Sequence, residues 1–267
     1  MKPSTTFPNN KRSGRDGSWG RRLAKTALIL LFWLLLWQAA YQLVGKAVVL
    51  PSPYGTFATL LKLLWTKGFY LDVSATMIRV LLGIVISFAL GLFTAVAAYL
   101  IPVLEEVLRF AVQFLKSTPV MAVIIFALLW LNSDQVPVFV CFLMCYPVVY
   151  TNILSGLDSL DLEYIEMCRI FRIRRRDMVR SVYIPFVGPH IKSALSLTTG
   201  LSWKTVVAAE VLASPKFSMG YNLLNAKVYL ETESLFAWII AIVSLSLVFE
   251  KAVRLILTQD KRRQPHD

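Results

Sequence analysis

The chain has 267 residues, 57% of them apolar, a mean hydropathy of +0.61 and a formal net charge of +12. Soluble domains are usually about 45–50% apolar, so the composition excludes an ordinary water-soluble domain and predicts a polytopic, all-α membrane protein. Three cysteines and two scattered histidines exclude a disulfide framework and a zinc motif, and we expect no metal site.

Residues 1–25 are rich in Lys, Arg, Ser and Gly, which predicts a disordered basic cytoplasmic tail. Residues 26–45 then form a run of twenty residues without a charge, long enough to cross about 30 Å of hydrocarbon as a helix. A cleaved signal peptide is the alternative, but the apolar run is too long for a typical h-region. We therefore predict a retained first transmembrane helix.

The segment after the first span contains the pattern of a short helix. "LPSP" at 50–53 stops helix continuation. The apolar residues that follow recur at helical spacing: Phe57, Leu60, Leu61 and Leu64. The pattern predicts an amphipathic helix on the outer membrane surface.

A second span is predicted near 80–101, inside a stretch of 25 residues without a charge. Small side chains recur at every fourth position of this span: Gly83, Ser87, Gly91 and Ala95. Such a stripe lets the backbone of another helix approach closely. A helix of the same chain and a helix of another copy both fit the pattern.

The third, fourth and fifth spans, expected near 110–131, 136–156 and 193–213, carry unusual polar residues. Pro119 and Pro147 each free a carbonyl, which is tolerated where protein or a water-filled cavity satisfies it. We interpret the polar side chains as candidates for a wet central pathway, unless the hydroxyls simply bond to their own helices. These pathway candidates are Ser117, Thr118, Thr151, Asn152, Thr198, Ser202, Lys204 and Glu210.

Lys204 is the most informative of these candidates. It lies about twelve residues into its span, roughly 18 Å deep at about 1.5 Å per residue, where a lysine costs several kcal/mol unless it is paired or hydrated. Glu210 lies on another side of the helix, so the two do not simply pair along one face. Either Lys204 faces the pathway or an interhelical partner, or it snorkels from a span placed differently.

The sixth span is predicted near 234–256, followed by a cytoplasmic tail at 258–267. With the N-terminus in the cytoplasm, 21 of the 28 Lys and Arg residues fall in cytoplasmic segments and six in outer ones. The positive-inside rule therefore predicts that both termini are cytoplasmic. This topology explains the net charge without a nucleic-acid partner.

The cytoplasmic loop 158–192 holds six arginines within 169–180. Asp161 can cap a helix that runs to about Phe171, with Glu163 in its first turn. The arginines can hold the loop on anionic lipid, or the loop can dock into a soluble partner. The arginines alone do not decide between these interpretations.

A second helix in this loop is expected from about Arg174, and Pro185 and Pro189 are expected to end it before the fifth span. Its apolar stripe is formed by Met178, Val179, Val182 and Tyr183.

The spacing in this loop resembles the E-A-A-x-x-x-G-x(9)-I-x-x-P loop of the membrane subunits of binding-protein-dependent ABC importers. Glu166 matches the glutamate and Pro185 the proline, whereas Arg172 stands at the glycine, and Met167 and Cys168 replace the alanines. "LPSP" at 50–53, "SATMIRVLLG" at 74–83 and "LSWKTVVAAEVLA" at 201–213 resemble the nitrate/sulfonate/taurine branch. The likeness extends over about residues 45–257.

This resemblance implies a type I ABC importer permease fold (MetI-like), with two permease copies around one pathway. It further implies two cytoplasmic ATPase subunits that hold ATP-Mg and each receive one loop, and an extracytoplasmic solute-binding protein. The chain itself lacks a G-x-x-x-x-G-K-[ST] phosphate loop, so we expect no enzyme activity and no cofactor on it. The residues implied in coupling to the ATPase are Asp161, Glu163, Glu166, Arg169, Arg172, Met178, Val182 and Pro185.

Two other classes are the alternatives. A stand-alone secondary transporter would usually contain two related halves, and the sequence contains no evident internal repeat. A membrane-embedded enzyme would need converging catalytic side chains within the spans, and His190 has no carboxylate near it in sequence. The branch suggests a small anion such as nitrate, a sulfonate or taurine, or a vitamin precursor, as the solute.

Overall fold

The computed structural model describes residues 16–259, and most of the predicted tail 1–25 and of the tail 258–267 lies outside this part. The described part is all α-helical and contains no strand, as the sequence predicts. In chain order it contains α1 (Asp16–Val44), α2 (Pro53–Leu64), α3 (Lys67–Leu100), α4 (Pro102–Ser117), α5 (Val120–Leu128), α6 (Val136–Asp158), α7 (Leu162–Ile170), α8 (Arg175–Met178), the π-helical turn η1 (Val179–Tyr183), α9 (Ile184–Ala213), α10 (Met219–Val228) and α11 (Thr232–Gln259).

Within residues 16–259, four helices are long and apolar enough to cross a membrane: most of α1, α3, α6 and α11. The bent pair formed by α4 and α5 makes a fifth candidate. Three of the predicted helices are longer than expected, because α1 begins at Asp16, α3 at Lys67 and α9 at Ile184. The prediction of a tail without structure up to residue 25 is therefore wrong for residues 16–25.

The third predicted span is not one straight helix. Thr118 has extended backbone angles (φ −79°, ψ 127°), and the chain turns by 98° between α4 and α5. Pro119 explains the break, because a proline disfavours helical geometry in the residue before it and donates no hydrogen bond. Pro147, in contrast, lies inside α6 without ending it.

The expectation that Pro185 and Pro189 end the second loop helix is also wrong. The chain stays helical from Arg175 through η1 into α9 and passes both prolines. In η1 the amide of Ile184 donates to the carbonyl of Val179, five residues back. This wider turn comes immediately before Pro185, where the ordinary ladder would lose a donor.

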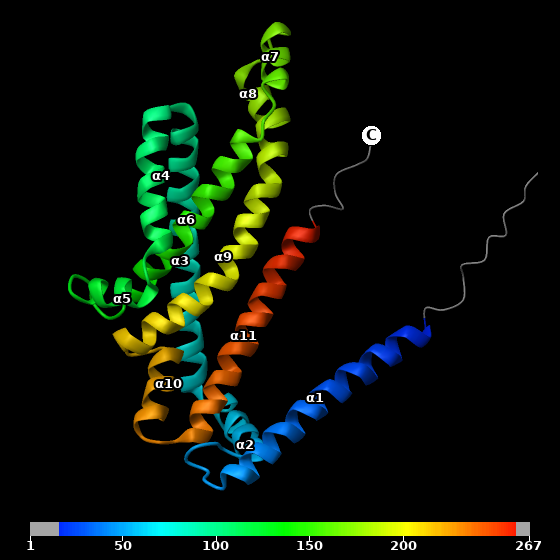
Figure 1. Ribbon diagram of the computed structural model, residues 1–267, viewed down its shortest axis with the longest axis vertical. Helices are drawn as coiled ribbons and strands as arrows, with labels where there is room; N and C mark the ends of the chain where they lie inside the picture. The colour runs from blue at the N-terminus through cyan, green and yellow to red at the C-terminus, as the bar shows by residue number, and fades with distance from the viewer. Residues whose placement is uncertain (1–15, 260–267) are drawn as a thin grey trace, which may run out of the picture.

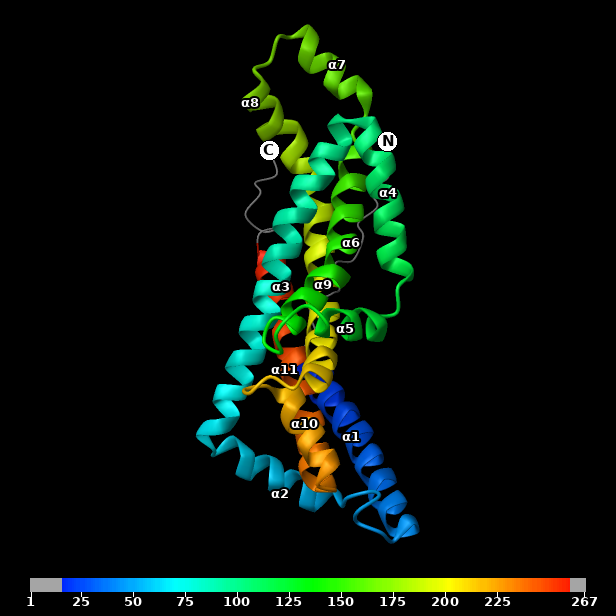
Figure 2. The ribbon, with the colours of Figure 1, turned by 90° about the vertical axis from the view of Figure 1, so that its left-hand side faces the viewer.

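The helices form an elongated bundle in which α3, α6 and α9 run side by side (Figures 1 and 2). α7 and α8 lie at one end of it, and α2 and α10 lie at the other. α9 packs on α3, α5, α6, α10 and α11, so its polar residues face protein on several sides. α9 is less apolar than the four spanning helices. That α9 crosses the membrane as the fifth span stays a prediction.

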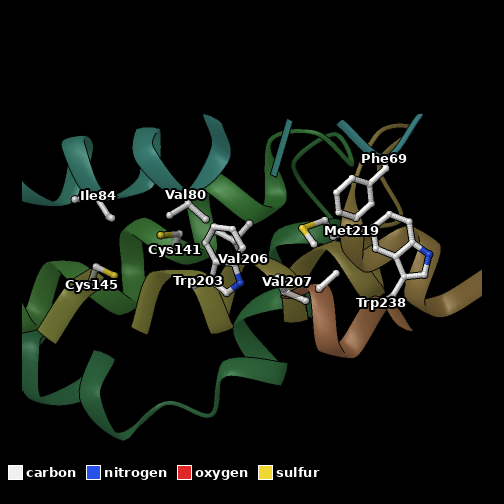
Figure 3. Packing of buried hydrophobic residues seen from close by; sticks show 11 residues of the cluster. Phe69, Val80, Ile84, Cys141, Cys145, Trp203, Val206, Val207, Met219 and Trp238 are labelled. Carbon is white, nitrogen blue, oxygen red and sulfur yellow. The ribbon is translucent and has the colours of Figure 1, made fainter. Parts of the chain in front are cut away.

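A hydrophobic cluster joins α3, α6, α9, α10 and α11 (Figure 3). Trp203 on α9 lies at its centre, is 1% exposed, and donates its indole N–H to the carbonyl of Ile242 at 3.1 Å. Phe69 and Trp238 stack at one end of the cluster, with ring centroids 5.4 Å apart. The predicted amphipathic helix is α2, which packs against α11.

The small-residue stripe on α3 faces α6 of the same chain, which answers the question that the sequence leaves open. A Cβ atom at Gly83 would overlap Sγ of Cys141, and one at Gly91 would lie 2.7 Å from Cγ1 of Val149. The Ser87 hydroxyl also lies 3.2 Å from the carbonyl of Phe142 across this contact. The stripe therefore joins two helices of one subunit.

We expect Gly91→Ala to destabilise the protein by about 1–3 kcal/mol, the usual cost of overpacking, because the added methyl group meets both Val149 and the backbone of Tyr150. Thermal unfolding in detergent, followed by tryptophan fluorescence, measures the change. Gly200→Ala on α9 is the matched control, since a Cβ atom there meets nothing within 4 Å. Equal unfolding midpoints for the two variants would contradict the close contact.

Candidate functional site

The coupling candidates lie together on one hairpin at the end of the bundle, formed by α7, the turn after it, α8 and η1 (Figure 2). The Asp161 carboxylate accepts a hydrogen bond from the amide of Glu163 at 3.2 Å, so it caps α7 as the sequence predicts. Glu163 and Glu166 are exposed on α7, and Pro185 is exposed where α9 begins. The side chain of Arg169 lies outside the described part.

The turn between α7 and α8 depends on a left-handed residue. Arg172 has φ 51°, and the amide of Ile173 donates to the carbonyl of Cys168 at 3.0 Å. This pattern is a Schellman motif, whose left-handed position is usually glycine. An arginine there costs about 1–2 kcal/mol, so the turn keeps its geometry in spite of the substitution.

The hairpin also exposes large apolar side chains. Five of them project from its two arms and are between 46% and 78% exposed: Tyr164, Met167, Ile170, Phe171 and Val179. Met178, Val182 and Tyr183 of the predicted stripe are half-buried instead, and Tyr183 packs edge-on against Tyr99 of α3. Exposed apolar patches of this kind mark contacts with another protein or with a membrane.

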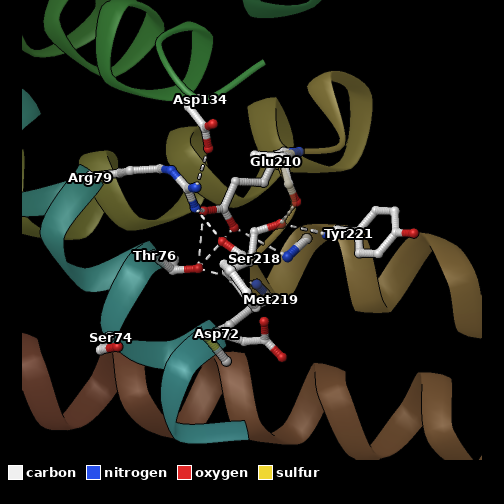
Figure 4. A network of polar contacts seen from close by, with 12 residues as sticks. Asp72, Ser74, Thr76, Arg79, Asp134, Glu210, Ser218, Met219 and Tyr221 are labelled. Carbon is white, nitrogen blue, oxygen red and sulfur yellow. Dashed lines mark hydrogen bonds and ion pairs between the residues drawn. The ribbon is translucent and has the colours of Figure 1, made fainter. Parts of the chain in front are cut away.

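Near the opposite end of the bundle, a buried ion pair joins α3 to α9 (Figure 4). Nη1 of Arg79 lies 2.8 Å from Oε1 of Glu210, and the Glu210 side chain is fully buried. The Thr76 hydroxyl lies 3.0 Å from both carboxylate oxygens of Glu210. The buried carboxylate therefore accepts a charge-assisted hydrogen bond from the guanidinium as well as one from the hydroxyl, and charge-assisted bonds of this kind are among the strong ones in proteins.

The same network also holds the start of α10 and the loop before α6. The amide of Gly220 donates to Glu210 at 3.2 Å, and that of Met219 donates to the Thr76 hydroxyl at 3.1 Å. Arg79 donates through Nη1 to the carbonyl of Phe217 at 2.7 Å and through Nη2 to Oδ1 of Asp134 at 2.8 Å. The network thus connects α3, the loop before α6, the end of α9 and the start of α10.

Comparison with known proteins identifies the chain. Residues 87–258, more than half of it, match the family described as "Binding-protein-dependent transport system inner membrane component". The chain belongs to this family. It is therefore a transport permease and not an enzyme.

The permease is similar over most of its length to named relatives. One relative, from Bacillus subtilis strain 168, is named as an aliphatic sulfonates transport permease protein. It is 26% identical over 250 residues, which cover 93% of this chain and 88% of the relative. The permease is 22% identical over 234 residues to the taurine transport system permease protein of Escherichia coli K12, covering 85% and 84%. These names place the permease among membrane subunits of ABC importers.

The fold of the permease is that of MetI-type subunits. It matches a chain of the inward-facing MetNI methionine ABC transporter with a TM-score of 0.58 and 16% identity, covering 71% of this chain and 96% of that chain. A chain of an amino acid ABC transporter matches with a TM-score of 0.54 and 18% identity, covering 73% and 94%. The predicted fold class is thus confirmed.

The structure does not join the pathway candidates of the permease in one hydrogen-bonded network. Six of them bond to carbonyls of their own helix three or four residues back, at 2.8–3.0 Å: Ser117, Thr118, Thr151, Asn152, Thr198 and Ser202. Lys204 is exposed on α9, and Glu210 is buried on another side of that helix. Only Glu210 joins the polar network.

Sequence analysis missed Arg79 and Asp134 as site residues. Because the second span was placed at 80–101, Arg79 counted as a charge of the outer loop, whereas it lies about one third of the way along α3. The signal that could have found it is an arginine between the apolar residues of "SATMIRVLLG", since an ionisable residue within a span is usually paired with another polar or charged group.

Residues 16–259 contain no group of three or more potential metal ligands.

Proposed function

We propose that the permease is the membrane-spanning subunit of an ATP-driven importer, and that the hairpin of α7 and α8 transmits motion from cytoplasmic ATPase subunits that hold ATP-Mg. The observation that carries this proposal is the set of exposed apolar side chains on both arms of the hairpin. Lipid attraction would explain the arginines alone. Apolar side chains beside the exposed carboxylates of Glu163 and Glu166 fit a protein groove better, because anionic lipid would repel those carboxylates.

In this proposal the hairpin and both termini are cytoplasmic, and α2 and α10 lie on the outer side. The positive-inside rule supports this orientation, since most Lys and Arg residues then fall on the cytoplasmic side. A solute-binding protein would deliver its solute at the end of the bundle that carries α2 and α10.

The permease would work as a homodimer. The break at Thr118 and Pro119 leaves non-helical backbone between α4 and α5, and α5 and the turn after it expose Ile125, Phe126 and Trp130. Broken backbone at membrane depth is tolerated only where protein or water covers it. A second copy across this face would provide that cover.

The solute would be a small anion or zwitterion. This assignment rests on the relatives named for aliphatic sulfonates and taurine, and on a Synechocystis relative named for bicarbonate transport, 26% identical over 211 residues and covering 74% of both chains.

Reconstitution in vesicles tests the proposal. The permease would be co-expressed with a candidate ABC ATPase and purified through a tag on the permease alone, and uptake of taurine would be measured with a taurine-binding protein present. We expect co-purification and, for a matching solute, uptake that needs ATP on the hairpin side. Uptake driven by an ion gradient without ATP would indicate a secondary transporter instead.

A further inference from the structure

Arg79 has two acidic partners that differ sharply in exposure. The Glu210 side chain is 0% exposed, whereas the Asp134 side chain is 72% exposed. A buried pair is costly to break because it leaves an uncompensated charge. An exposed carboxylate can replace its ion pair with an arginine by hydrogen bonds to water, at little cost in free energy. The two halves of this contact therefore differ in how easily they open.

The two halves also hold different segments. Glu210 and the carbonyl of Phe217 tie Arg79 to α9 and to the chain just before α10. Asp134 lies in the loop between α5 and α6. Its bond to Arg79 is an ion pair that holds this loop on α3. Loss of the Asp134 contact would remove this ion pair between the loop and α3 and leave the contacts of α10 in place.

An open groove lies beside the loop. Its volume is about 480 Å³. The loop contributes Leu131, Asp134 and Gln135 to its lining, and α3 and α6 contribute apolar side chains. α5, which precedes the loop, is joined directly to it and lies at 98° to α4, at the side of the bundle (Figures 1 and 2).

We propose that the bond between Arg79 and Asp134 is a releasable latch, which holds the α5–α6 loop on α3 in the resting permease and opens during transport. Arg79 and Glu210 form its fixed half and position the guanidinium. Asp134 is its moving half. The proposal rests on the proposed transport function only in one respect, namely that ATP binding causes the latch to open. The existence of the latch can be tested without nucleotide.

Two single-cysteine probes in the permease–ATPase complex test the latch. Leu131→Cys reports on the loop, and Lys227→Cys reports on α10, while Cys141, Cys145 and Cys168 are buried. The measured quantity is the rate of modification by a membrane-impermeant maleimide without nucleotide. We expect Asp134→Asn to raise the rate at position 131 about three- to fivefold, as for loss of one exposed ion pair, and to leave the rate at position 227 unchanged.

Two further variants and one condition complete the experiment. Asp134→Glu should restore the original rate at position 131, and Glu231→Gln, which removes an exposed carboxylate elsewhere, should leave it unaltered. Trapping the complex with ATP and vanadate should raise the rate without any change at Asp134. Equal rates for Asp134→Asn and the unsubstituted residue, or a parallel rise at position 227, would overturn the latch. A latch that responds to Asp134→Asn but not to ATP would instead count against the proposed coupling.

Discussion

Arg79→Met is expected to destabilise the permease by about 3–5 kcal/mol, the usual cost of removing one partner of a buried ion pair. The substitution leaves Glu210 fully buried without its counter-charge and removes a donor from the carbonyl of Phe217. We expect a large fall in the thermal midpoint and in the amount of protein in the membrane. Asp134→Asn removes only the exposed partner of Arg79, so its midpoint should change little.

A double substitution shows whether the loss comes from the stranded charge. In Arg79→Met/Glu210→Gln the buried carboxylate becomes a neutral amide, which can still accept hydrogen bonds from Thr76 and the amide of Gly220. We expect the double variant to be more stable than Arg79→Met alone, measured by thermal unfolding in the same detergent. Additive losses would mean that the charge pair itself has little part in stability.

Glu166→Lys is expected to abolish coupling without removing the permease from the membrane. Glu166 is exposed on α7, so the substitution leaves the packing of the bundle unchanged. Reversal of a charge in a protein interface costs several kcal/mol, and each 1.4 kcal/mol lowers affinity about tenfold. Uptake and solute-stimulated ATPase activity should therefore fall at least about tenfold in reconstituted vesicles.

The direction of this effect separates the two interpretations of the hairpin. An added lysine strengthens attraction to anionic lipid by about 1 kcal/mol, so a hairpin that only binds lipid would keep or gain function. Glu106→Lys, at an exposed position of α4 outside the hairpin, is the matched charge-reversal control and should transport normally. Normal uptake by Glu166→Lys would remove the coupling role of Glu166.

Much of this fold follows from patterns that are local in sequence. Runs without charge predicted the spans, and Asp161 predicted the start of α7. Small residues at every fourth position predicted a close contact with another helix, which the structure identifies as α6. The position occupied by Arg172 is left-handed, whereas the sequence left open whether the turn keeps this geometry with an arginine in place of glycine. Each of these features depends on the backbone preference or the size of residues in one short segment.

The parts that sequence analysis missed depend on tertiary contacts. Pro119 breaks a helix and Pro189 does not, although both stand in apolar surroundings, because neighbouring helices decide which freed carbonyl is tolerated. The ion pair of Arg79 with Glu210 joins residues 131 positions apart. No single segment contains the information that these two charges meet.

Disulfide crosslinking of the hairpin to the ATPase tests the central claim most directly. Val179→Cys, whose native side chain is 48% exposed on the second arm, would be combined with single cysteines around the surface groove of the ATP-binding subunit and oxidised in membrane vesicles. We predict a crosslinked pair whose yield changes between the nucleotide-free and the ATP-bound complex. Failure of Val179→Cys to crosslink to any ATP-binding subunit, together with its modification by an impermeant reagent only from the outer side, would contradict the account.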